Sequence, residues 1–222
     1  MKIVDTRAEQ ELLEAMIEGT KPMMPSECRH LNYLLSTPFR YDADYPKGSR
    51  FRRAGKTEGV FYAAEAAQTA VAEMAFFRLV FYAESPGTPW PGNPSDYTAF
   101  SAAVFTAAMV DLTVSPLDVA KQDWTDPISY QACQAMADTV RAAGGDVIRY
   151  ESVRDPQRRA NLAVLKSAAL TQPNPIDLQT WRLLLNANGV QAFCENPRER
   201  IEFDRNTFAA DPRIADLQWD RR

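Results

Sequence analysis

GVFYAAEAAQTAVAEMAFFRLVF, residues 59–81, is the stretch that decides the fold. It begins with a short apolar run, GVFYAA at 59–64, which predicts a β-strand. From Ala66 onward, apolar and small side chains recur every three to four residues, which is the period of a helix with one face toward a core. The sequence therefore predicts a strand that leads directly into a core-facing helix over residues 66–81.

Glu73 lies on the stripe that this helix would turn toward the core. All members of the stripe are apolar or small except Thr69 and Glu73. The stripe consists of Ala66, Thr69, Ala70, Glu73, Phe76, Phe77 and Val80. Burying an unpaired carboxylate is costly, so Glu73 needs a partner. Two interpretations stay open. Glu73 is half of a buried ion pair, with Arg78 or an arginine of the preceding loop, or it is the carboxylate of a functional site.

The rest of the chain mixes short helices and strands without a regular strand–helix–strand rhythm. Asn188-Gly189 is a strong turn signal and predicts a hairpin over residues 180–195. We therefore predict an α+β fold with a mixed, mostly antiparallel sheet core and flanking helices. The other expected elements are helices at 8–18, 27–35 and 129–143, and strands at 100–113, 146–152, 161–165 and 201–203.

The composition is that of an ordinary globular domain. The 222 residues are 45% hydrophobic and 24% charged, with a formal net charge of -4. This balance argues against a disordered chain and against a broad basic surface for nucleic acid. No segment has the pattern of a membrane span or a signal peptide. We expect one cytoplasmic domain over residues 1–222, with a helical extension at 1–35 and no direct binding to nucleic acid or membrane.

The cysteines and the histidine argue against metal chemistry. Cys28, Cys133 and Cys194 are far apart and form no CxxC pair, so we expect three reduced thiols. His30 is the sole histidine, which rules out a histidine-rich metal site. We therefore expect no metal cofactor.

Residues 36–59, STPFRYDADYPKGSRFRRAGKTEG, predict a long polar loop. Long irregular segments in compact domains are commonly functional. Arginines and aromatic residues alternate here, and guanidinium groups bind phosphate while tyrosine faces stack on planar rings. A nucleotide ligand suits this pattern best. A solvated basic loop or a site for single-stranded nucleic acid would use the same residue types.

Several motifs, in the same order, resemble the RES domain family. They are TPFRY at 37–41, GSRF at 48–51, GVFYAAE at 59–65, QTAVAEMAFFR at 68–78, VIRYESVRDP at 147–156 and NLAVL at 161–165. The resemblance covers about residues 33–170. The family is named for an arginine, a glutamate and a serine. Glu73 and Ser152 match the last two, and either Arg40 or Arg50 matches the arginine.

The resemblance implies a bacterial toxin with an ADP-ribosyltransferase-like fold that cleaves the nicotinamide–ribose bond of NAD by hydrolysis or phosphorolysis. NAD is then the substrate, and the partner is an Xre-type helix-turn-helix antitoxin whose C-terminal region occludes the active site. Glu73 would stabilise the developing ribosyl cation, as carboxylates do in glycoside hydrolysis. The expected catalytic residues are Glu73, Tyr62, Arg50 and Ser152, and the expected NAD-binding residues are Arg40, Tyr41, Arg50, Tyr62 and Ser152.

Two other functions share this set of residues. An ADP-ribosyltransferase that modifies a host protein would use the same first step, and an inactive binding module would keep the fold alone. Tyr62 is also compatible with a core position, and Ser152 with an ordinary strand end. The sequence departs from the family pattern at 157–160, QRRA, where many relatives carry a glycine pair. The acceptor of the ribosyl group therefore stays open.

Overall fold

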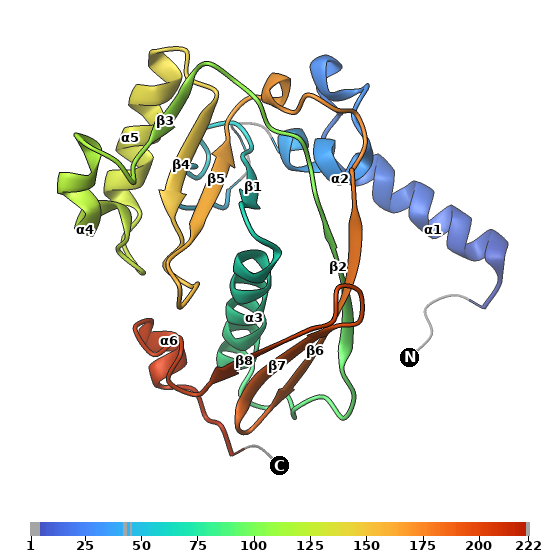
Figure 1. Cartoon of the computed structure of the whole chain (residues 1–222). Helices are drawn as coiled ribbons and strands as arrows, with labels where there is room; N and C mark the ends of the chain where they lie inside the picture. Colours follow the sequence, from blue (N-terminus) through green and yellow to red (C-terminus); the bar gives the residue numbers. More distant parts are fainter. Residues whose placement is uncertain (1–4, 42–43, 45, 221–222) are drawn as a thin grey trace.

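The computed structural model of the chain describes residues 5–41, 44 and 46–220. Within them, two four-stranded sheets lie at opposite ends of the central helix α3 (Ala67–Glu84), as Figure 1 shows. Helices flank both sheets. This arrangement confirms the predicted α+β class.

The first sheet has the strand order β1-β5-β4-β3. The strands are β1 (Phe61–Ala64), β5 (Ala160–Val164), β4 (Val147–Glu151) and β3 (Met109–Asp111). All neighbouring strands are antiparallel except β3 and β4, which are parallel. The sheet is therefore mixed, as predicted.

The second sheet is antiparallel throughout, with the order β2-β6-β7-β8. Its strands are β2 (Ser95–Phe100), β6 (Leu178–Asn186), β7 (Gly189–Cys194) and β8 (Glu199–Asp204). The predicted hairpin at Asn188-Gly189 joins β6 to β7. Gly189 has a φ of 132°, in the region that glycine alone adopts readily.

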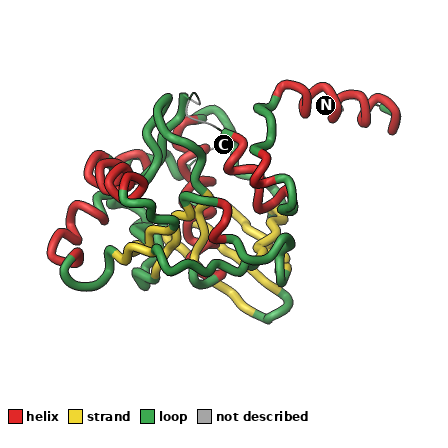
Figure 2. The backbone as a smooth tube through the Cα atoms, turned by 90° about the horizontal axis from the view of Figure 1, so that it is seen from above, coloured by secondary structure: helices red, strands yellow, loops and turns green. Residues whose placement is uncertain are grey.

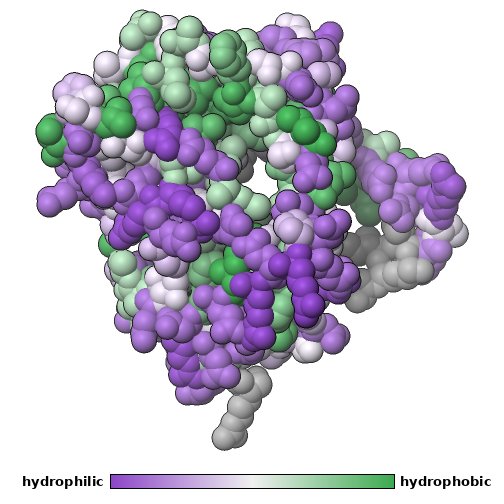
Figure 3. All heavy atoms as spheres, in the orientation of Figure 1, coloured by the Kyte–Doolittle hydropathy of each residue, from purple (hydrophilic) through white to green (hydrophobic). Residues whose placement is uncertain are grey.

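The remaining helices surround these sheets. They are α1 (Arg7–Thr20), α2 (Tyr33–Ser36), α4 (Lys121–Trp124), α5 (Gln131–Ala142) and α6 (Pro212–Ala215), with short 3-10 turns at Ser26–Cys28, Thr37–Arg40, Leu117–Ala120 and Ser167–Ala169. Helix α1 has no buried residue and projects from the body, as Figures 1 and 2 show. Its visible surface is mainly hydrophilic (Figure 3). Among the described residues, no helix combines the length and apolar character needed to cross a bilayer.

Three clusters of buried side chains form the core. Helix α3 packs on the second sheet, with Val71, Ala75 and Leu79 against residues such as Trp181. Helix α5 covers one face of the first sheet, and the segment from Cys28 to Phe39 covers the other face. Because α3 follows β1 directly and packs on the second sheet, it links the two sheets.

The buried face of α3 differs from the predicted stripe. Phe77 is 59% exposed and Ala70 is also exposed, whereas Val71, Ala75 and Leu79 are buried. The helix is apolar over most of its circumference, so its sequence period cannot select the buried face. The contact with the second sheet selects it.

Two predicted elements were wrong in extent. The strand at 100–113 is interrupted, because β2 ends at Phe100 and β3 begins at Met109. Between them the chain passes from one sheet to the other and pairs irregularly with residues 169–177, for example through the bridge between Val104 and Leu170. The helix at 27–35 is broken because Asn32 caps a new helix, accepting a hydrogen bond from the Leu34 backbone N–H at 3.0 Å.

Gly59 permits a close crossing where the polar loop enters β1. A Cβ atom at this position would lie 1.9 Å from the Pro38 carbonyl oxygen. We expect Gly59→Ala to lower the free energy of unfolding by about 1–3 kcal/mol, because backbone atoms must move apart. Gly19→Ala is the control, since nothing lies within 4 Å of its added Cβ. Equal urea-unfolding midpoints for the two variants would contradict the close-crossing explanation.

Candidate functional site

The loop before β1 is ordered by an inward-pointing arginine. The Arg52 side chain is buried and donates to four backbone carbonyls, those of Lys47 (2.5 Å), Thr57 (3.1 Å), Glu58 (3.3 Å) and Tyr41 (3.5 Å). A guanidinium group with several donors suits such irregular backbone. Arg52 therefore has a structural role, and the interpretation of these arginines as a solvated basic loop is wrong at this position.

Helix α5 holds the same loop from the side. The Gln134 amide donates to the carbonyls of Ser49 (3.0 Å) and Arg52 (3.1 Å). Arg53 forms an ion pair with Asp138 at 2.6 Å. These contacts fix the backbone between residues 49 and 53, which in turn positions the groups around Tyr62.

One face of the first sheet gathers polar side chains. In the strand register, Tyr150 of β4 pairs with Asn161 of β5, and Tyr62 of β1 pairs with Ala163 of β5. Residues two apart on a strand share a face, so Tyr62, Tyr150 and Asn161 point to the same side. Ser152, directly after β4, continues this row.

Glu73 reaches this row from helix α3. Its Oε1 atom accepts hydrogen bonds from the Ser152 hydroxyl at 2.7 Å and from the Asn161 amide at 2.8 Å. Across residues 5–41, 44 and 46–220, no ion pair involves Glu73 and no hydrogen bond reaches its Oε2 atom. The ion-pair interpretation is therefore wrong: within the described residues the partners of Glu73 are neutral, and they bind one of its two carboxylate oxygens.

The direction of the Ser152 hydrogen bond follows from its other contacts. The side chain is fully buried, and its oxygen accepts from the backbone N–H groups of Arg154 (3.2 Å) and Asp155 (3.1 Å). These two bonds occupy both lone pairs, so the single hydroxyl proton goes to Glu73. Ser152 is thus a fixed donor to the carboxylate.

Thr69, the other polar residue of the α3 stripe, binds Asp155 in the turn that follows Ser152. Thr69 donates to the Asp155 carboxylate at 2.7 Å, and Arg159 adds bonds of 2.5 and 3.0 Å. Although burial of Asp155 acts to raise its pKa, the bonds from Arg159 and Thr69 outweigh this effect and lower the pKa. Arg159, part of the departure from the family pattern, therefore clamps the turn, while Arg158 is exposed at φ 55°.

Two tyrosines on this face of the first sheet are neutral phenols. Tyr62 as a residue is 39% exposed, whereas its hydroxyl contacts Ser49 Oγ at 2.8 Å and accepts from the Phe51 N–H at 2.9 Å. Burial of this hydroxyl raises the pKa of Tyr62. Tyr150 is buried, and its burial followed by the nearby charge of Glu73 raises its pKa well above the usual value.

Two buried arginines border the site. Arg50 donates to the carbonyls of Trp124 and Asp126, each at 2.9 Å, and lies over the Tyr130 ring at 4.6 Å. Arg154 donates to the Pro127 carbonyl at 2.8 Å and forms an ion pair with Asp211 at 3.2 Å. Both arginines therefore hold the segment 124–127 beside the site.

The sequence did not identify Arg154 as a site residue, although it lies in the RES-like motif VIRYESVRDP at 147–156. Its burial lowers its pKa, partly offset by nearby anions that include Asp211 and Glu73. The guanidinium group also packs on the Phe76 ring at 3.7 Å. The signal in the sequence was an arginine two residues after Ser152, but only the fold shows that it turns toward Glu73.

Arg40 and Tyr41 lie outside this cluster. Arg40 forms an ion pair with Glu18 of α1 at 2.6 Å and donates to the Pro22 carbonyl at 2.8 Å. Tyr41 is half-buried. The structure thus brings together Tyr62, Glu73, Ser152 and Arg50, and does not place Arg40 or Tyr41 with them. An NAD-binding role for these two residues stays a prediction.

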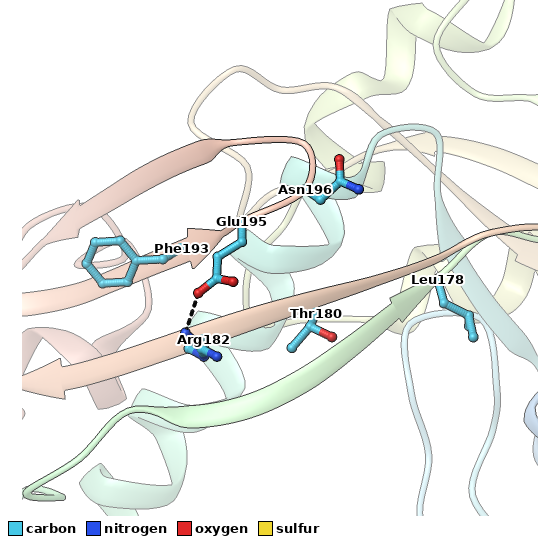
Figure 4. A pocket seen from close by; sticks show the side chains of 6 residues that line it. All are labelled: Leu178, Thr180, Arg182, Phe193, Glu195 and Asn196. Atoms are coloured by element: carbon cyan, nitrogen blue, oxygen red, sulfur yellow. Dashed lines mark hydrogen bonds and ion pairs between the residues drawn. The ribbon is translucent and has the colours of Figure 1, made fainter.

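Two surface hollows lie away from Glu73. One, of about 420 Å³, is on the opposite face of the first sheet and is lined by Glu65, Ala66, Thr113, Arg149, Glu151, Arg158, Arg159 and Ala160. Figure 4 shows the other, of about 280 Å³, on the second sheet, where Arg182 pairs with Glu195 at 2.6 Å. Charged groups in both hollows already pair with each other, as Arg149 does with Glu65. The Glu73 cluster is the better candidate because its carboxylate is not neutralised.

Among the described residues, no cluster of His, Cys, Asp or Glu could hold a metal ion.

Comparison with family models supports the sequence resemblance. The model of the RES domain matches residues 24–186. The chain belongs to the RES domain family. The matched range includes Glu73, Ser152 and Asn161, whereas α1 and Asp211 lie outside it. Comparison with curated proteins gave no match.

The Ser152 hydroxyl should stabilise the fold as well as orient Glu73. Ser152→Ala leaves two buried N–H groups and one carboxylate oxygen short of a hydrogen bond, so we expect the free energy of unfolding to fall by roughly 1–3 kcal/mol. Ser129→Ala is the matched control, because Ser129 is exposed. The check is chemical denaturation of both variants. An unchanged midpoint for Ser152→Ala would show that the turn forms without this hydroxyl.

Proposed function

We propose that this RES-family chain cleaves the nicotinamide–ribose bond of NAD and acts as a toxin that depletes NAD. The observation that carries the proposal is the hydrogen bonding of the Glu73 carboxylate. One carboxylate oxygen is held by two neutral donors, and the other has no partner among the described residues. A carboxylate held in this way is suited to stabilise a developing positive charge.

Cleavage of the nicotinamide–ribose bond creates the positive charge that Glu73 would stabilise. Departure of neutral nicotinamide takes the bonding electrons with it and leaves a ribosyl cation with oxocarbenium character. The carboxylate of Glu73 stabilises this cation until water or phosphate adds to the same carbon, as in glycoside hydrolysis. The exposed face of Tyr62 would stack on the nicotinamide ring and hold it for departure.

Arg50 is a better candidate than Arg40 for the essential arginine of the family name. Arg50 and Arg154 are the buried guanidinium groups beside the cluster, and their charge favours a diphosphate nearby. In the present arrangement Arg50 supports the wall at 124–127. Its proposed contribution to NAD binding is therefore electrostatic and positional, and Arg40 and Tyr41 are proposed only as outer contacts.

The partner proposed for this toxin is an Xre-type antitoxin in the cytoplasm, whose C-terminal region covers the Glu73 site. An adjacent reading frame for such a protein would support this part of the proposal. Co-expression should then restore growth to cells that express the chain.

Incubation of the purified protein with NAD, with and without phosphate, tests the reaction directly. Release of nicotinamide in both conditions indicates hydrolysis, and release only with phosphate indicates phosphorolysis. Transfer of labelled ADP-ribose to a protein would instead identify an ADP-ribosyltransferase. Absence of all three products from folded protein, together with normal growth of expressing cells, would contradict the proposed function.

Glu73→Gln should abolish most turnover while the protein stays folded. Glutamine keeps the shape but lacks the charge, and loss of one such electrostatic contact costs a factor of about 10² to 10³ in rate. Among the described residues Glu73 is in no ion pair, so no charged partner is left unpaired and melting should be near native. Glu84→Gln, at the exposed end of the same helix, is the control. Native turnover by Glu73→Gln would exclude its catalytic role.

A further inference from the structure

Asn161 shares one oxygen of Glu73 with Ser152. It lies on β5, is only 4% exposed, and its Nδ2 atom donates to Glu73 Oε1 at 2.8 Å. The orientation of the amide is fixed by chemistry, because a carboxylate oxygen accepts and cannot meet the amide oxygen. Asn161 is therefore a donor to the same atom that receives the Ser152 hydroxyl.

Two donors on one oxygen define how the carboxylate lies. Rotation of the Glu73 carboxylate would break both bonds at once, of 2.7 and 2.8 Å. The donors themselves come from rigid places, since Asn161 is held in register opposite Tyr150 and Ser152 is fixed by two backbone N–H groups. The result is a carboxylate with Oε1 bound and Oε2 directed away from its partners.

We propose that Asn161 is a positioning residue that aims Oε2 of Glu73 at the ligand. The proposal rests on the proposed function in taking NAD ribose as that ligand. The local geometry is independent of the ligand, because the two hydrogen bonds exist in the protein alone. Asn161 would touch Glu73 and not the reacting atoms.

Other charged and titratable groups lie on the same face of the sheet or in the turn after β4. Tyr150 of β4 and Tyr62 of β1 have raised pKa values and stay neutral. Arg154, from the turn after β4, has its pKa lowered by burial and forms an ion pair with Asp211. Asp155, in the same turn, has a lowered pKa and is held by Arg159.

Asn161→Asp tests the positioning role. The substitution keeps the shape, removes the N–H donor and places a second carboxylate beside Glu73. A like charge and a lost donor both disfavour the ionised form, so Glu73 should take up its proton at a higher pH than in the wild type. Asn161→Leu removes the amide without adding a charge and should give a smaller shift in the same direction. Asn206→Asp, at an exposed position, is the control for added charge and should leave the Glu73 titration unchanged.

The titration is read by carbon NMR of the full-length chain with labelled glutamate, and Glu73→Gln identifies the signal. Nicotinamide release is measured on the same preparations. We expect kcat to fall by about tenfold or more in Asn161→Asp with KM for NAD changed less than about threefold, and the acid limb of the pH profile to move upward.

The two readouts separate the possible failures. One outcome is that the wild-type protein does not cleave NAD while the pH at which Glu73 takes up its proton rises from wild type to Asn161→Leu to Asn161→Asp. In that case the proposed function fails and the positioning contact stands. If the Glu73 signal is the same in all three folded proteins, Asn161 does not position the carboxylate. If Asn161→Asp does not fold, the comparison of wild type with Asn161→Leu decides.

Discussion

The contact between Glu73 and the first sheet is the constraint on which the site depends. Helix α3 packs its apolar side chains on the second sheet, but its one inward carboxylate is bound by groups of the first sheet, Ser152 and Asn161. Apolar packing sets where the helix lies, since it has no direction of its own. Hydrogen bonds are directional, and these two set the orientation of the Glu73 carboxylate.

Buried arginines complete this arrangement where the backbone is irregular. Arg52 binds carbonyls of the loop before β1, and Arg50 and Arg154 bind carbonyls of the segment 124–127. Buried carbonyl groups outside helices and sheets need donors, and a guanidinium group supplies several from one side chain. Arg154 also places positive charge near Glu73.

The turn from Ser152 to Arg159 connects these features. Ser152 bonds Glu73, Arg154 borders the site, and Asp155 binds Thr69 on the turn of α3 before Glu73. The two polar residues on the apolar stripe of α3 thus bind the same short segment. This explains why a helix so rich in apolar residues carries Thr69 and Glu73 four residues apart.

Much of the architecture was open to prediction from local patterns. The strand–helix unit at 59–84, the hairpin at Asn188-Gly189 and the α5 helix follow from hydrophobic period and turn chemistry, which act over a few residues. The strand predicted at 100–113 failed because an extended segment pairs with whatever lies beside it. Its first residues join one sheet and its last residues the other, and no local pattern contains that change of partner.

The sequence by itself indicated that Glu73 needs a partner if its helix turns it toward the core, because burial of a carboxylate is costly wherever it occurs. Only the tertiary structure decided which partner. The polar loop at 36–59 carries four arginines and Arg78 follows Glu73. Yet the fold turns Arg40 to Glu18, Arg52 and Arg53 to the loop and α5, and Arg50 to the segment 124–127. Two neutral residues some eighty positions away, Ser152 and Asn161, bind the carboxylate instead. Strand register brings them there, and register is a property of paired strands that no single segment carries.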